Sequence, residues 1–298
     1  MNYPTVPKAI HIAIVGGGIG GAVLGIALSK LPNLTFTIYE SRAAFGEIGA
    51  GLGFGANAHR AMNLICPSIW EGYKTVASFN GWPEKQNVWF DFQVGEKGPD
   101  EGKRIAEIVM STDICQSSAH RAHFLDQLVA LLPKGCAEFG KRLVDVDQSQ
   151  EKVVLQFADG TKAEADAVVG CDGIRSACRA VVLEKELVAP VFTKKVAYRG
   201  LVPMKIAESA LGIEKSQNRQ MYLGHNRHCI TFPVAKGALM NVVAFSGLDS
   251  DTWEGDWVKP RQKEHAQRAF QGWGEKVIKI MEVCAFTLFV AMTNMSES

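Results

Sequence analysis

The sequence lacks the features that mark membrane spans, metal clusters and surfaces for polyanions. No apolar stretch approaches the roughly 20 residues that a membrane-spanning helix needs, so we expect no span. Lys and Arg number 32 against 31 Asp and Glu, a net charge of +1, which provides no broad basic field and predicts no nucleic-acid partner. The seven cysteines are scattered without a C-x-x-C pair, so we expect no metal site and free thiols in a reducing compartment.

The sequence contains no internal repeats or low-complexity segments, and we expect no secretory leader. The first apolar run, IHIAIVGGG, begins at Ile10 and is typical of a strand rather than of a signal peptide. We therefore expect a cytoplasmic protein. Apolar residues make up 47% of the 298 residues, which allows one large domain or two moderate domains with a sizeable core.

A strand, a glycine-rich turn and a helix follow one another in IHIAIVGGGIGGAVLGIALSK. Gly16, Gly18 and Gly21 form a G-x-G-x-x-G pattern, which permits a tight turn, a close approach to a pyrophosphate and close packing of the helix. The next strand, LTFTIYE, ends at Glu40, where a carboxylate can bind both hydroxyls of an adenosine ribose. Because Glu40 would repel a 2′-phosphate, the pattern predicts FAD or NAD rather than NADP here.

Two further segments predict contacts to the same cofactor. Alternating glycines in EIGAGLGFGANAHRAM, with Gly53 among them, let the backbone lie close to a flat ligand. The segment SSAHRAHFLDQLVALLPKG predicts an amphipathic helix with an N-cap at Ser117 and an end near Pro133. Arg121 would lie in its first turn, where a cation is poorly placed for the helix dipole. This residue either holds a polar cofactor edge or is simply exposed.

A third segment, KVVLQFADGTKAEADAVVGCDGIRSACR, predicts a hairpin, a buried strand and a helix start. Asp159–Gly160 is a hairpin turn signal, and ADAVVG has the composition of a buried strand. Asp172 and Gly173 follow the carboxyl end of that strand, the edge at which open α/β sheets bind ligands. Asp172 could contact a nucleotide there, or could serve only as a helix cap.

Taken in order, these segments resemble the single-component FAD-dependent aromatic hydroxylases, specifically the salicylate hydroxylase-like branch. The resemblance covers residues 10–282 and also includes AYRGLVPM and YLGHNRHCITFPV. It implies an α/β fold in which a Rossmann-like FAD-binding domain is interleaved with a β-sheet substrate domain. The expected cofactor-binding residues are Gly16, Gly18, Gly21, Glu40, Gly53, Arg121, Asp172 and Gly173.

The resemblance also sets expected domain boundaries. Residues 1–185 would form the FAD-binding domain, with 76–105 adding strands to a substrate domain at 186–270. Residues 271–298 would be a return segment and an atypical tail. The third FAD motif of the family, G-D-A-A-H, would fall after residue 298, so we expect the C-terminal part to be missing and FAD binding to suffer. The apolar segment Ala285–Met292 has no evident partner in the sequence and would be a liability if exposed.

The chemistry implied by the resemblance is hydroxylation of a small phenolic or aromatic acid by FAD, with NAD(P)H and O2 as co-substrates. Arg199 is the expected catalytic and substrate-binding residue, because a cation could hold a carboxylate or stabilise a phenolate; it could also be structural. Tyr222 and Phe232 are the other expected substrate contacts, and Phe232 stands where many members have tyrosine. Two alternatives stay open: a non-catalytic remnant, and a flavin-dependent dehydrogenase that does not activate O2. The oligomeric state is not predicted.

Overall fold

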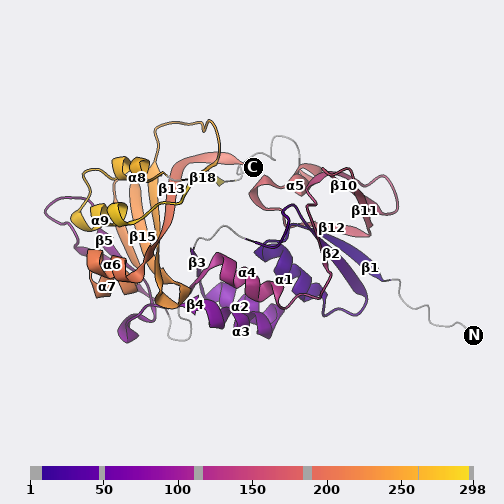
Figure 1. Ribbon diagram of the computed structural model, residues 1–298, viewed down its shortest axis with the longest axis horizontal. Coiled ribbons are helices and arrows are strands. Elements are labelled where there is room, and N and C mark those ends of the chain that lie inside the picture. Colours follow the sequence, from indigo (N-terminus) through magenta and orange to yellow (C-terminus); the bar gives the residue numbers. More distant parts are fainter. Residues whose placement is uncertain (1–8, 47–50, 111–116, 184–189, 261, 295–298) are drawn as a thin grey trace, which may run out of the picture.

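The computed structural model describes residues 9–46, 51–110, 117–183, 190–260 and 262–294. It has two halves that lie side by side, a nucleotide-binding half around β1 and a half built on a large sheet around β15 (Figure 1). The first half comprises β1 (Ile10–Val15), α1 (Ile19–Leu28), β2 (Leu34–Glu40), β8 (Ala137–Phe139), β9 (Leu143–Asp147), β10 (Val153–Phe157), β11 (Lys162–Ala165), β12 (Ala167–Gly170) and α5 (Ala177–Val182).

A parallel four-stranded sheet in the order β12-β1-β2-β8 forms the centre of the nucleotide-binding half. The residues Ala13 and Ile14 of β1 are fully buried, because β1 has neighbours on both sides. The predicted Rossmann-like arrangement is therefore confirmed. The prediction that ADAVVG is a buried strand is wrong, because β12 lies at the edge of this sheet and Val169 is 38% exposed.

The predicted hairpin is present as β10 and β11, which pair antiparallel. Gly160 has a φ of +82°, in the left-handed region that favours glycine. The Asp159 carboxylate accepts a hydrogen bond from the backbone N–H of Thr161 at 3.0 Å. A local turn signal was thus enough to place this element.

The second half is built on an eight-stranded sheet in the order β17-β18-β13-β16-β15-β14-β5-β6. The strands are β5 (Val88–Val94), β6 (Arg104–Val109), β13 (Val191–Pro203), β14 (Gln220–Gly224), β15 (Arg227–Val234), β16 (Leu239–Gly247), β17 (Val258–Pro260) and β18 (Leu288–Asn294). The helices beside it are α6 (Met204–Leu211), α7 (Ile213–Gln217), α8 (Lys263–Ala269) and α9 (Glu275–Val283). The chain enters this sheet twice, once before and once after the nucleotide-binding half is complete.

Side chains alternate between the two faces of the large sheet. We call the face that packs against α6, α8 and α9 the helix-covered face, and its core includes Tyr198 and Tyr222. The opposite face, called the inner face below, carries Phe232 and Met221 among its apolar residues. Gly51 of strand β3 (Gly51–Phe54) donates its backbone N–H to the Asn241 Oδ1 at 2.9 Å, so the inner face is turned toward β3.

The apolar run near the end of the chain is part of this sheet. β18 pairs antiparallel with β13, and Phe289 stands opposite Tyr198. Phe286 is fully buried and Phe289 is 4% exposed, both within the core of the helix-covered face. The expectation that Ala285–Met292 has no partner is therefore wrong, because β18 pairs with the edge of the long strand β13.

A third layer lies beside the nucleotide-binding sheet. It contains β3 (Gly51–Phe54), α2 (Ala56–Ile65), α3 (Pro67–Val76), β4 (Ala77–Ser78), β7 (Ser117–His120) and α4 (Arg121–Val129). The helix predicted to start at Ser117 starts at Arg121 instead, because residues 117–120 pair with β3 and β4 as a strand. None of the helices in the described ranges is long and apolar enough to cross a membrane.

Candidate functional site

The turn between β1 and α1 depends on glycine at two positions. Gly16 has a φ of +106°, and a Cβ there would lie 2.4 Å from the Cys171 carbonyl oxygen. A Cβ on Gly21 would lie 1.9 Å from the Gly16 carbonyl oxygen, so α1 packs directly against the turn. The N-terminus of α1 therefore faces the space above the turn, where an anion is stabilised.

Glu40 lies beside this turn at the carboxyl end of β2. Its Oε2 accepts a hydrogen bond from the Gly17 N–H at 2.7 Å, and its Oε1 accepts one from the Arg42 N–H at 2.8 Å. A Cβ on Gly17 would lie 3.0 Å from the Glu40 Oε2. The absence of a side chain at Gly17 is what lets the carboxylate come this close to the turn.

A cavity of about 350 Å³ opens above the turn and gathers most of the predicted cofactor residues. Six of the eight line it: Gly16, Gly18, Glu40, Arg121, Asp172 and Gly173. Gly21 lies beneath the turn. Gly53 lies on β3, where it pairs with Ser118 of β7, and is not part of this lining.

Four cations outside the eight expected cofactor-binding residues also line this cavity: Arg42, Lys141, Arg142 and Arg175. The Lys141 ammonium donates to the Asp159 carboxylate at 2.8 Å, and this bond raises the pKa of Lys141. Cations, a helix N-terminus and a carboxylate together suit the phosphates and ribose hydroxyls of an adenosine diphosphate, so the residues present fit that half of FAD. Lys141 and Arg142 follow β8 in a stretch without a motif, so no sequence pattern pointed to them.

Asp172 serves as a cap for α5. Its Oδ2 accepts hydrogen bonds from the N–H groups of Ala177 and Cys178 at 2.7 and 3.1 Å, and its Oδ1 accepts one from the Ser176 hydroxyl at 2.5 Å. Burial, together with the nearby Asp172 charge, raises the pKa of the Cys178 thiol to about 12. The structure thus shows the capping role, and a nucleotide contact of Asp172 stays a prediction.

Arg199 lies on β13 with its side chain on the inner face, since it stands opposite Val243 in a row that ends at Met221. Its Nε is buried and has no hydrogen-bond partner among the described residues. Burial lowers the pKa of Arg199, and the positive charge of Arg121 lowers it further. Two cations from the two halves therefore approach each other, which favours a ligand that carries negative charge between them.

The structure places Phe232 on the same face of the large sheet as Arg199, and Tyr222 on the opposite face. Phe232 is 4% exposed on the inner face, where a Cβ on Gly51 would lie 2.8 Å from its ring. Tyr222 is on the helix-covered face, and its hydroxyl is buried without a hydrogen-bond partner among the described residues. The three predicted substrate contacts thus do not share one surface.

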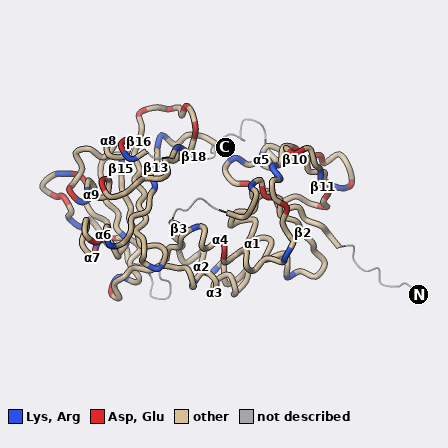
Figure 2. Tube along the Cα trace, in the orientation of Figure 1, with Lys and Arg blue, Asp and Glu red and all other residues tan. Residues whose placement is uncertain are grey.

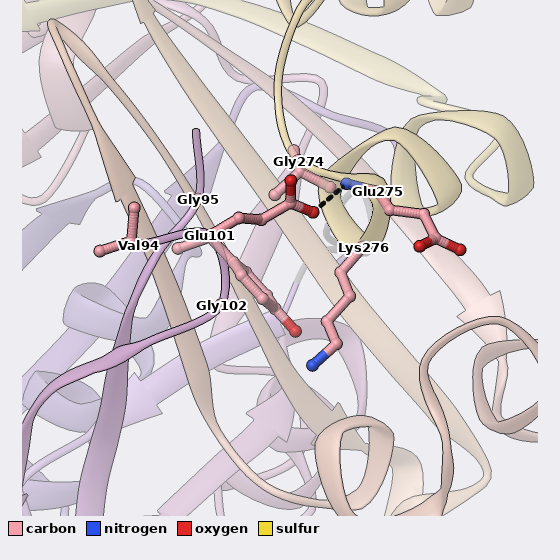
Figure 3. A pocket seen from close by; sticks show the side chains of 9 residues that line it. Val94, Gly95, Glu101, Gly102, Gly274, Glu275 and Lys276 are labelled. Carbon is pink, nitrogen blue, oxygen red and sulfur yellow. Dashed lines mark hydrogen bonds between the residues drawn. The ribbon is translucent and has the colours of Figure 1, made fainter. Parts of the chain in front are cut away.

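Tyr222 lines a second, smaller cavity of about 110 Å³ at the start of α9 (Figure 3). There the Glu101 carboxylate accepts a hydrogen bond from the Glu275 N–H at 2.7 Å, and the Lys276 side chain extends past the same space. Glu101 therefore occupies the N-terminus of α9. This arrangement secures the loop after β5 to α9 and lies away from Arg199.

Charge elsewhere is distributed without a single-sign field, because Lys, Arg, Asp and Glu are interspersed over both halves (Figure 2). Within the described ranges, no group of three or more His, Cys, Asp or Glu residues could hold a metal ion.

Arg219 is a notable residue that sequence reasoning missed. It directly precedes β14 and is 1% exposed, with its guanidinium carbon 5.3 Å from the Phe232 ring centre and 6.0 Å from that of Phe90. The alternation in NRQMYLG was the available signal, since it places Arg219 and Met221 on one face of a strand. Arg219 thus belongs to the inner face.

Comparison with known proteins agrees with this geometry. The chain is 39% identical to the 6-methylsalicylate 1-monooxygenase of Aspergillus terreus, over 94% of this chain and 63% of that protein. It is 38% identical to a salicylate hydroxylase of Pseudomonas putida, over 97% of this chain and 68% of that protein. It is 42% identical to an FAD-dependent monooxygenase of Monascus ruber, over 94% of this chain and 64% of that protein. The chain thus spans about two thirds of the length of these relatives.

Solved structures show the same relationship. A salicylate hydroxylase in complex with substrate superposes with a TM-score of 0.80 at 32% identity, over 97% of this chain and 69% of that chain. Klebsiella pneumoniae HpxO, solved with FAD and uric acid, has the same fold at 19% identity with a TM-score of 0.77. No known protein family's profile matches the chain. Because it resembles salicylate hydroxylases both in sequence and in structure, the chain belongs to the salicylate hydroxylase-like family of FAD-dependent monooxygenases.

Proposed function

We propose that the protein is an FAD-dependent monooxygenase that hydroxylates a small phenolic or aromatic acid with NAD(P)H and O2. The observation that carries this proposal is the cavity that brings together the glycine turn, Glu40 and Arg121, with Arg199 of the large sheet close enough to Arg121 for the two charges to interact. The relatives named for salicylate and 6-methylsalicylate support this substrate class. FAD, when bound and reduced, supplies the oxygen chemistry.

The nucleotide-binding half supplies the cofactor contacts. Glu40, already positioned by the Gly17 N–H, accepts hydrogen bonds from ribose hydroxyls. The N-terminus of α1 and the cations Arg42 and Arg175 stabilise the phosphates. Arg121 lies at the end of the same cavity nearest to Arg199, where it binds a polar edge of the cofactor.

The large sheet supplies the substrate contacts. Met221, Ile230 and Phe232 form an apolar surface on the inner face that packs against an aromatic ring and excludes water. Arg199 is the cation at the edge of this surface nearest to Arg121, and it stabilises a substrate phenolate by lowering the pKa of the phenol. A phenolate is the more nucleophilic form of the ring, so this contact promotes hydroxylation. The six described free cysteines support a cytoplasmic location.

The test is incubation of the chain with FAD, NAD(P)H and salicylate under 18O2, followed by mass spectrometry of the aromatic product. The proposal requires a product with one 18O atom, formed only when FAD and NAD(P)H are both present. Arg199→Met should slow hydroxylation while FAD stays bound. Consumption of NAD(P)H with H2O2 as the only product would instead indicate a dehydrogenase, and failure to bind FAD would indicate a remnant.

A further inference from the structure

The buried arginine Arg219 of the inner face forms no ion pair with any carboxylate of the described residues. Burial lowers the pKa of the Arg219 guanidinium to about 10, and the Tyr73 hydroxyl acts on this pKa in the opposite direction. Asp91 donates its backbone N–H to the Arg219 carbonyl oxygen at 3.1 Å, but its carboxylate belongs to another cluster, where it pairs with Arg104 at 2.8 Å and Lys215 at 3.4 Å. Stacking on two phenylalanine rings offsets only part of the cost of burying this charge.

Several buried donors of the inner face also lack acceptors. Arg219 Nε and Nη2, Asn241 Nδ2 and Arg199 Nε have no hydrogen-bond partner among the described residues. The Oδ1 of Asn241 accepts from Gly51, which fixes its Nδ2 as the free donor. All four atoms are N–H donors and none is an acceptor, so the missing partner must bring acceptor atoms.

The strand register places these donors at opposite corners of one surface. Phe232, Asn241 and Leu201 stand side by side across β15, β16 and β13, and Arg219 adjoins this row next to Phe232. Arg199 is two residues along β13 from Leu201. Three strand spacings and two residues separate the Cα atoms of Arg219 and Arg199 by roughly 16 Å. Two arginine side chains and one aromatic ring can fill this span.

We propose that Arg219, assisted by Asn241, is the residue that binds the carboxylate of the aromatic substrate and thereby selects acids over neutral phenols. This inference rests on the proposed function, and it assigns the two arginines different roles. Arg219 holds the carboxylate at one corner of the inner face. Arg199 then faces the ring and its hydroxyl group at the other corner, near Arg121.

The experiment compares salicylate with salicylamide, which has the same ring and hydroxyl group but no negative charge. Binding of each to the full chain is measured by isothermal titration calorimetry, with and without FAD, for wild type, Arg219→Met, Arg219→Lys and Arg227→Met. Arg227 is the matched control because it lies on neighbouring β15, two residues from Cys229 of the helix-covered face. FAD binding is measured separately for each variant.

We expect the wild type to prefer salicylate by about tenfold or more, the effect of one charged hydrogen-bond pair. Arg219→Met should bring the ratio of the two dissociation constants to about one, Arg219→Lys should keep part of the preference, and Arg227→Met should keep all of it. The melting temperature of Arg219→Met without ligand should stay the same or rise, because a buried charge without a counter-ion is removed.

A preference for salicylate that survives in Arg219→Met would overturn the inference, as would a wild type that shows no preference or binds neither compound. A lower melting temperature with an unchanged preference would assign Arg219 a structural role. Loss of FAD binding by the wild type would contradict the proposed function alone, because the salicylate preference is also measured without FAD.

Discussion

The Glu40 carboxylate accepts a hydrogen bond from the Gly17 N–H at 2.7 Å, which joins the end of β2 to the turn after β1. The backbone N–H of Arg42 holds the other carboxylate oxygen at 2.8 Å. The carboxylate is therefore held in place before any ligand binds, which reduces the entropy cost of using it for recognition.

This relationship predicts that Glu40→Gln weakens FAD binding by about 1–3 kcal/mol, or roughly five- to 150-fold in Kd, because a charged acceptor is lost. Quenching of FAD fluorescence on titration with the chain measures the effect. Glu164→Gln, at an exposed position on β11, is the control and should bind FAD like the wild type. An unchanged affinity in Glu40→Gln would remove Glu40 from the site.

Two neighbouring glycines should respond in opposite ways to alanine. A Cβ on Gly21 would lie 1.9 Å from the Gly16 carbonyl oxygen, whereas a Cβ on Gly20 meets nothing within 4 Å. Gly21→Ala should therefore destabilise the protein and disrupt the turn. Gly20→Ala should stabilise it by about 0.5–1 kcal/mol, because alanine favours the helix. Urea denaturation gives both values, and equal effects would show that the turn does not require close packing.

Phe289 should contribute strongly to stability through β18. Its ring lies 5.4 Å from the ring of Tyr198 and 5.4 Å from that of Trp253 between ring centres. Phe289→Ala should lower the free energy of unfolding by about 3–5 kcal/mol, the range for a buried phenylalanine. Leu64→Ala, at a side chain that is 85% exposed, should cost less than about 0.5 kcal/mol. A small effect at Phe289 would mean that β18 is not part of the folded core.

His59 should make stability depend on pH below neutrality. Burial lowers its pKa below the usual 6.5, and the Arg219 charge lowers it further. Between the lowered pKa and 6.5 the unfolded chain binds more protons, so the free energy of unfolding falls as the pH falls through this window. His59→Gln should flatten the fall in melting temperature between pH 7 and pH 5, as measured by scanning calorimetry. If the melting temperatures of the two proteins fell in parallel with pH, protonation of His59 would make no contribution to the pH dependence of stability.

The nucleotide site was largely predictable because its signals are local. The glycine turn, the position of Glu40 and the hairpin at Asp159–Gly160 each depend on a few consecutive residues. By contrast, β18 becomes a strand only through pairing with β13, about 90 residues earlier in the chain. Serine is likewise a residue that favours helix N-caps, but Ser117 pairs with β3 and is part of a strand.

The substrate surface was predictable only in part, because a one-residue difference in register changes the face of a side chain. Tyr222 pairs with Cys229, which pairs in turn with Ala244 opposite Tyr198, and all four lie on the helix-covered face. Arg199 is the next residue after Tyr198 and so faces the other way. Arg219 lies outside every motif; the alternation in NRQMYLG places it on the same face as Met221, but only the register shows that this is the inner face.

The most direct test of the whole account is the equilibrium binding of FAD to the chain. It is measured by equilibrium dialysis, with ADP added as a competitor. The account predicts saturable binding of one FAD per chain, displacement by ADP because it occupies the adenosine diphosphate part of the cavity, and weaker binding of both by Glu40→Gln. FAD binding that does not saturate, or that ADP and Glu40→Gln leave unchanged, would contradict it.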